Sequence, residues 1–171
     1  LLLFLGIPKI AHATPPIEGN PVSMGSASTV VTTSNPARAV AVADLDQNGR
    51  PDLAFADGDS LQIVVNTGTS SPSWSTPPST VGSTSYNVLD LVAVDFDRDS
   101  KIDLVAAASD ASGNSELKLW RNPGNPFTTG WTASNTLTST ANITLTTVAA
   151  GDLDGDRAPD LVTGGHDGII H

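Results

Sequence analysis

One nine-residue pattern occurs three times in this chain, and the repetition constrains the fold more than any other feature. The copies span residues 44–52, 95–103 and 152–160, and each has an acidic or amide side chain at positions 1, 3, 5 and 9. In a strand this spacing would place every charge on one face, and in a helix it would scatter the charges around the cylinder. In a tight loop the same spacing can direct four oxygen-bearing side chains toward one point. The pattern therefore predicts three copies of one acidic loop.

Carboxylates that converge in this way need a cation between them. Two carboxylates about 4 Å apart repel each other by roughly 4 kcal/mol at an effective dielectric constant of about 20. Calcium takes roughly 6 to 8 oxygen ligands in flexible geometry, whereas magnesium demands a stricter octahedron and keeps its waters. Turns rich in Asp and Gly also join hairpins without any metal. Three copies with all four positions filled favour calcium, and we predict one calcium site in each loop.

An EF-hand shares the opening of this pattern but requires a bidentate Glu at position 12 and a helix on each side. Position 12 is occupied here by Phe55, Ala106 and Thr163. Short apolar runs flank the loops instead, and such runs are typical of buried strands. The runs are residues 39–43 and 53–56, 91–94 and 104–107, and 147–150 and 161–163. The repeated unit is therefore predicted to be strand, acidic loop, strand.

Position 6 of the loop is expected to have a positive φ angle. The first loop has Gly49 there, but the other two have Ser100 and Arg157. A non-glycine residue in such a conformation costs on the order of 1 to 3 kcal/mol. We therefore expect more strain in the second and third loops. Their carboxylate at position 5, where the first loop has Asn48, should offset part of that strain.

The repeat extends beyond its loop. Successive loops begin 51 and 57 residues apart, a period that indicates a propeller, a solenoid or an array. Third strands are predicted at 61–65 and 117–121, each followed by an Asn-x-Gly turn, and polar fourth strands at 79–83 and 136–140. This predicts an all-β fold of four-stranded antiparallel units, two complete and one partial. Residues 28–33 resemble the fourth strands and are predicted to be a lone outer strand, with a linker over residues 14–36 as the alternative.

The beginning of the chain has the pattern of an exported protein. Residues 1–7 are apolar like the end of a signal peptide, and residues 11–13 form an A-x-A cleavage site. We predict a signal-peptide remnant at 1–13, a linker at 14–27 and the repeats at 28–171. The apolar stretch is too short to span a membrane. Because it lacks an initiating Met and a basic segment, we expect that the true N-terminus is missing.

Composition excludes several classes of function. The net charge of −10 comes mainly from the loops, which hold 11 of the 16 aspartates, and no Lys or Arg cluster is present to bind nucleic acid. The absence of cysteine excludes disulfides and thiol chemistry. Of the three histidines, His12 lies in the signal peptide, His166 in a predicted turn, and His171 at the last position. A catalytic carboxylate pair is needed only once, so its threefold repetition argues for a structural role and against an enzyme.

The pattern D-x-D-x-[DN]-G-x-x-D-L, set between the first two strands of a four-stranded unit, resembles the FG-GAP/VCBS-type repeats of β-propellers such as the head of integrin α chains. The resemblance covers roughly residues 28–171, and the loops with Ser100 and Arg157 depart from the family's glycine. It implies calcium between the first two strands of each blade. The implied side-chain ligands are Asp44, Asp46, Asn48, Asp52, Asp95, Asp97, Asp99, Asp103, Asp152, Asp154, Asp156 and Asp160, and the implied main-chain carbonyls are those of Arg50, Lys101 and Ala158. Since propellers have about 4 to 8 blades, we expect a fragment of a longer protein.

Two functions are consistent with these features. The first is a secreted or cell-surface, calcium-stabilised propeller that acts as a binding or adhesion scaffold for a protein or carbohydrate ligand. The alternative is the propeller portion of a larger secreted enzyme, such as one that degrades polysaccharides, with its active site elsewhere. Trp74, Trp120 and Trp131 could form a sugar-stacking surface, but packing between blades is the favoured interpretation because two of them recur at one place in the repeat.

Overall fold

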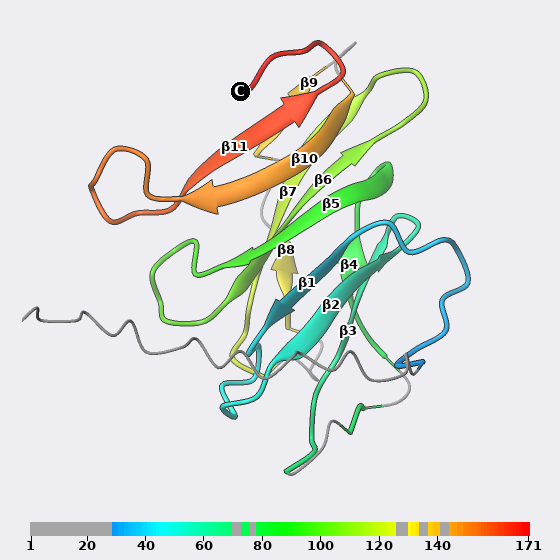
Figure 1. Ribbon diagram of the computed structural model, residues 1–171, viewed down its shortest axis with the longest axis vertical. Coiled ribbons are helices and arrows are strands. Elements are labelled where there is room, and N and C mark those ends of the chain that lie inside the picture. Colours follow the sequence, from blue (N-terminus) through cyan, green and yellow to red (C-terminus); the bar gives the residue numbers. More distant parts are fainter. Residues whose placement is uncertain (1–28, 70–72, 76–77, 126–129, 134–136, 141–143) are drawn as a thin grey trace, which may run out of the picture.

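The computed structural model describes residues 29–69, 73–75, 78–125, 130–133, 137–140 and 144–171. The predicted signal peptide and the 14–27 linker lie outside these residues. Among the residues described, no helix is long and apolar enough to cross a membrane. The described residues form eleven β-strands (Figure 1): β1 (Val40–Ala43), β2 (Asp52–Asp57), β3 (Ser60–Val64), β4 (Ser79–Ser83), β5 (Asn87–Val94), β6 (Asp103–Ser109), β7 (Ser115–Arg121), β8 (Thr132–Ala133), β9 (Thr138–Thr140), β10 (Leu145–Gly151) and β11 (Asp160–Gly165).

The strands form three antiparallel sheets, one for each acidic loop. The first sheet has the order β1-β2-β3-β4, the second has β5-β6-β7-β8 with β9 also paired to β7, and the third is β10-β11. Each acidic loop joins the first two strands of its sheet, as predicted. In the third sheet Ile170 forms a bridge with Gly164, and His171 and Thr163 exchange two backbone hydrogen bonds of 2.8 Å. A third strand therefore begins at the C-terminal end, after a turn that contains His166.

The outer strand predicted at residues 28–33 is wrong for the part that is described, because residues 29–33 lie outside any strand. The chain is instead attached to the turn between β2 and β3. The backbone amides of Ser34 and Asn35 donate to the Asp57 carboxylate at 2.9 and 2.6 Å. The Ser34 bond makes the largest contribution in lowering the pKa of Asp57 below its usual value. In the second sheet the outer edge is divided between β8 and β9, whereas a single strand at 136–140 was predicted.

The second sheet is covered on both faces. All seven residues of β6 are buried. Because side chains alternate along a strand, Leu104, Ala106 and Ala108 pack toward the first sheet, while Val105 and Ala107 pack toward the third. Figure 1 shows the three sheets one after another, from β1–β4, coloured blue through cyan to green, to β10 and β11, coloured orange and red. The acidic loops therefore belong to successive sheets that share their core.

Trp120 fills the space between the first two sheets, with 1% of its surface exposed. Trp131 is partly buried against the same cluster. The neighbour of Trp120 in the first sheet is Gly82 in β4, where an added Cβ would lie 2.4 Å from the Trp120 Nε1 atom. These positions support packing between sheets as the role of both tryptophans.

Replacing Gly82 with alanine is expected to destabilise the protein by about 1 to 3 kcal/mol, the usual cost of overpacking a core. The added methyl group must displace the Trp120 indole or move β4. The free energy of unfolding in urea measures the effect. Gly151→Ala is the matched control, since no atom lies within 4 Å of a Cβ at that position. Equal stability of the two variants would contradict the close contact between Gly82 and Trp120.

Candidate metal centres

The three acidic loops share one backbone conformation. Positions 4 and 6 both have positive φ in every loop. Position 4 is Gln47 (59°), Arg98 (62°) and Gly155 (85°), and position 6 is Gly49 (83°), Ser100 (71°) and Arg157 (70°). The prediction for position 6 is confirmed, whereas position 4 was not predicted. The four non-glycine residues of positive φ in the described part of the chain all lie in these loops, which is where strain is expected at a functional site.

Side chains at positions 1 and 5 hold this conformation by accepting hydrogen bonds from the backbone amides of the loop. Position 1 accepts from the amide of position 6, and position 5 accepts from the amide of position 7. The first set is Asp44 from Gly49 (2.8 Å), Asp95 from Ser100 (2.9 Å) and Asp152 from Arg157 (3.0 Å). The second set is Asn48 from Arg50 (2.9 Å), Asp99 from Lys101 (2.9 Å) and Asp156 from Ala158 (2.6 Å). Each loop therefore folds around its own acidic or amide side chains.

The aspartate at position 9 connects the loop to the sheet. Asp52, Asp103 and Asp160 each begin the second strand of their sheet. Each accepts the backbone amide of position 2, which is Leu45 (2.8 Å), Phe96 (3.1 Å) or Leu153 (2.9 Å). The second carboxylate oxygen of Asp52 accepts a hydrogen bond from the backbone amide of Asn66 (2.8 Å), and that of Asp103 accepts one from Asn122 (2.9 Å). Both asparagines begin an Asn-x-Gly turn. Position 9 is therefore a structural anchor as well as a predicted ligand.

Asp52 and Asp103 are almost fully buried, with 0% and 1% of their surfaces exposed. Burial raises the pKa of both carboxyl groups above the usual value, although the amide hydrogen bonds oppose this shift. A nearby cation would favour their charged form. Asp52 lies close to two other carboxylates, whereas Asp103 does not belong to the corresponding group in its own loop.

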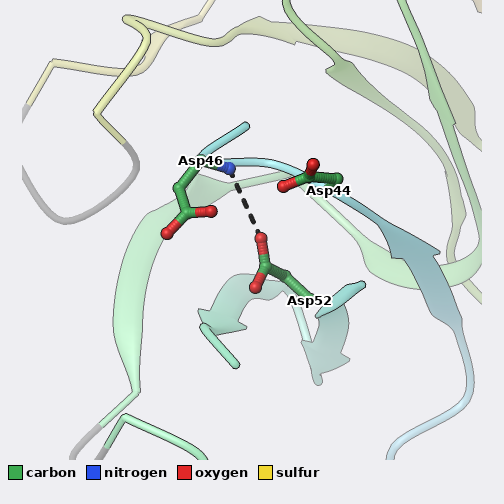
Figure 2. Close-up of side chains that lie close together, drawn as sticks. All are labelled: Asp44, Asp46 and Asp52. Atoms are coloured by element: carbon green, nitrogen blue, oxygen red, sulfur yellow. Dashed lines mark hydrogen bonds between the residues drawn. The ribbon is translucent and has the colours of Figure 1, made fainter. Parts of the chain in front are cut away.

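Nine of the eleven aspartates predicted as ligands come together in three groups. Within each group, one carboxylate oxygen from every residue lies within 4.8 Å of the others. Figure 2 shows the first group, in which the Asp46 backbone amide also donates to Asp52 at 3.4 Å. The groups are Asp44, Asp46 and Asp52; Asp95, Asp97 and Asp99; and Asp152, Asp154 and Asp160. Asp103 and Asp156 are outside these groups, and the position-7 carbonyls remain predicted ligands.

The second loop shows most directly that its donor set fits a cation. The Asp95 Oδ1 atom is buried and has no hydrogen-bond partner within the described part of the chain. An unpaired carboxylate oxygen in that environment is costly unless a positive charge binds it. Asp97 pairs with Arg121 at 2.9 Å, and Asp99 pairs with Lys101, whose hydrogen bond lowers the Asp99 pKa. This oxygen-only group, partly neutralised by Lys101 and Arg121, suits a hard cation such as calcium.

The first two loops contact each other. Gln47 at position 4 of the first loop donates its side-chain amide to the Ser100 carbonyl in the second. Asn122 Nδ2 donates to the Leu45 carbonyl at 2.8 Å and to the Ile102 carbonyl at 3.0 Å. Sequence reasoning assigned the Asn-x-Gly turns no role in the loops. The recurrence of this turn after both predicted third strands was the sequence signal that could have indicated such a role.

The three acidic loops and the strands from β2 to the first part of β11 match a known family of repeats. Residues 44–106 and 95–163 each match the sequence profile described as an FG-GAP-like repeat. Together these two matches span well over half of the chain. A search of curated proteins found no match.

Proposed function

This chain belongs to the FG-GAP-like repeat family, and from that premise we propose that it is a calcium-binding β-propeller segment that acts as an extracellular binding or adhesion scaffold. The observation that carries the proposal is the shared geometry of the three loops. Each loop has positive φ at the same two positions and a group of three carboxylates. In each, the side chains at positions 1, 5 and 9 accept the same hydrogen bonds from backbone amides. A repeated site of this kind supports a structural ion in each sheet.

The chain's own residues would hold the ion through oxygen atoms alone. Positions 1 and 3 of every loop supply carboxylates, joined by position 9 in the first and third loops and by position 5 in the second. When bound, calcium would supply two positive charges to a group of three negative ones. The hydrogen bonds that positions 1, 5 and 9 accept from backbone amides orient these side chains before any ion arrives. Binding would then cost little further loss of side-chain freedom.

The arrangement of the sheets supports a propeller. The second sheet packs against a neighbour on each face, and the side chains of β6 alternate between those neighbours. Asp90 in β5 also accepts hydrogen bonds from Thr147 Oγ1 (2.7 Å) and the Val148 amide (2.9 Å) in β10. Face-to-face packing of sheets in sequence order is what a propeller requires of neighbouring blades, and propellers close into rings of about 4 to 8 blades.

The scaffold role requires no chemistry from this segment. His166 lies in a turn, and His171 contacts Asp167 at 2.7 Å on the surface. A group of three carboxylates recurs in the acidic loop of each sheet, as a structural site would. We propose that a protein or carbohydrate partner binds to the exposed loops that this rigid stack of sheets presents.

Isothermal titration of the whole chain with calcium is the direct test, and we expect three ions per chain. A variant with Asp44→Asn and Asp46→Asn should bind two ions, because the first group then keeps a single carboxylate. Asp59→Asn is the matched control and should still bind three, since Asp59 is an aspartate outside the loops. No calcium binding by the wild-type chain would overturn the proposal.

A further inference from the structure

A chain of buried hydrogen bonds joins the first acidic loop to the second, running from one position-9 aspartate to the other. The backbone amide of Asn122 donates to Asp103 at 2.9 Å, and the Asn122 side chain donates through Nδ2 to the Leu45 carbonyl at 2.8 Å. The Leu45 amide then donates to Asp52 at 2.8 Å. All four residues have 4% or less of their surfaces exposed. Hydrogen bonds in such an interior are stronger than in water and strengthen one another.

The chain ends in the first loop next to the candidate ligands. Leu45 lies between Asp44 and Asp46, which belong to the first group of carboxylates together with Asp52. The peptide unit that offers its carbonyl to Asn122 also donates its amide, that of Asp46, to Asp52 at 3.4 Å. The position of the Asn122 side chain is therefore linked to the backbone that carries two of these carboxylates.

The chain ends in the second loop in the same way. One oxygen of Asp103 accepts from Asn122, and the other accepts from the Phe96 amide at 3.1 Å. Phe96 lies between Asp95 and Asp97, two carboxylates of the second group. Asn122 therefore holds position 2 of the first loop directly and position 2 of the second loop through Asp103.

A second contact joins the two loops at the surface. Gln47, at position 4 of the first loop, donates its side-chain amide to the carbonyl of Ser100, at position 6 of the second. Both residues have positive φ, at 59° and 71°. The Ser100 amide also donates to Asp95, at 2.9 Å. One hydrogen bond thus connects the two left-handed turns, and the second of these turns holds a candidate ligand.

The bond to the first loop is separate from the part that Asn122 plays in its own turn. Asn122 Oδ1 accepts from the Gly124 amide at 2.8 Å and closes the Asn-x-Gly turn. Asn66 makes the same turn bond in the first sheet, from Gly68 at 3.1 Å, and also donates its backbone amide to the position-9 aspartate of its own sheet. Asn66 is therefore a matched comparison for the turn and for the anchor.

We propose that Asn122 and Gln47 are positioning residues that couple calcium binding at the first two loops, so that an ion in either loop raises the affinity of the other. Binding in the first loop would fix Asp52 and the Leu45 peptide, and with them the acceptor of the Asn122 side chain. Fewer groups of the second loop would then remain to be ordered by its own ion, which favours the second binding step. The coupling is reciprocal, as linkage requires. This inference rests on the proposed function, because it requires calcium in both loops.

Isothermal titration with calcium measures the coupling in a chain whose third loop is disabled, which should bind two ions. Disabling the first or the second loop as well gives the association constant of each remaining site alone. Independent sites would give the two-ion chain an overall constant equal to the product of these two. We expect an overall constant at least about fivefold larger, the lower end of common allosteric coupling. The disabling pairs are Asp44→Asn with Asp46→Asn, Asp95→Asn with Asp97→Asn, and Asp152→Asn with Asp154→Asn.

Gln47→Ala and Asn122→Ala, each placed in all three of these chains, should bring the fivefold excess toward one while two ions still bind. Asn66→Ala is the matched control and should keep the excess, because its side-chain bond to the Gly68 amide lies within the first sheet. A merely structural role for Asn122 would weaken both single sites and leave the excess unchanged. Gln47 is exposed, so its variant should fold whatever the effect of Asn122→Ala on stability.

The outcomes separate this inference from the proposed function. A chain that binds two ions with the constant expected for independent sites would overturn the coupling and leave the calcium sites in place. An excess that persists in both folded alanine variants would overturn the roles of Asn122 and Gln47. An absence of calcium binding in the wild-type chain would instead overturn the proposed function itself.

Discussion

Saturating calcium is expected to stabilise the chain against unfolding by up to about 8 kcal/mol relative to the chelated protein. A ligand at about 100 times its dissociation constant contributes about 2.7 kcal/mol per site, and the chain has three groups of carboxylates. The unfolded chain cannot hold these carboxylates together, so calcium would bind mainly to the folded state. Urea unfolding followed by tryptophan fluorescence, with calcium and with EDTA, measures the difference.

Loss of a single site should remove roughly a third of this gain. Asp154→Ala is the informative variant, because Asp154 belongs to the third group and makes no ion pair within the described residues. Asp59→Asn should keep the full calcium effect. Identical unfolding curves in calcium and in EDTA would mean that the loops are turns without metal, and the central part of the proposed function would fail.

Trp120→Ala is expected to cost about 3 to 5 kcal/mol of stability, the usual range for removing a large buried aromatic side chain. The indole is 1% exposed and belongs to the core between the first two sheets, which would lose its largest member. Urea unfolding in saturating calcium isolates this effect from metal binding.

Two further variants show whether the loss comes from the position of Trp120. Trp120→Phe should recover much of the stability, since a ring still fills the space. Trp131→Ala should cost less than Trp120→Ala, because Trp131 is only partly buried. A Trp131 effect as large as that of Trp120 would contradict the central place assigned to Trp120 in this core.

The sequence predicted the strand, loop, strand unit because its signals are local. Apolar runs on both sides of each acidic loop became β1 and β2, β5 and β6, and β10 and β11. The fourth strand of the first sheet, β4, has the predicted limits. Repetition supplied the rest, since each copy supports the interpretation of the others.

The prediction failed where distant residues decide the outcome. Residues 29–33 are rich in Thr and Val, yet the chain that follows them is bound by Asp57 and no strand forms. Asn122 reaches Leu45 across 77 residues of sequence, which no local pattern reports. Position 9 was predicted only as a ligand, and its structural role was missed. That role depends on backbone amides of Asn66 and Asn122, which follow another strand and are not close in sequence.

The sequence also did not predict which face of each sheet packs against which neighbour. In β6 the successive residues Leu104 to Ala108 are all apolar and all buried, so the run alone does not show which side chains face which neighbour. The same property explains why Val40 and Val42 could not be recognised as exposed. Their run resembles those of the strands that are covered.

The two left-handed positions of each loop also determine how such loops should be sought in other sequences. A search pattern that demanded glycine at position 6 would accept the first loop and reject the second and third, which have Ser100 and Arg157 there. The hydrogen bonds from backbone amides to the side chains at positions 1 and 5 recur in all three loops, whichever residue has the positive φ angle at position 6. Patterns built on the acidic positions, an apolar residue at position 2 and a strand after position 9 would retrieve repeats that glycine-based patterns discard.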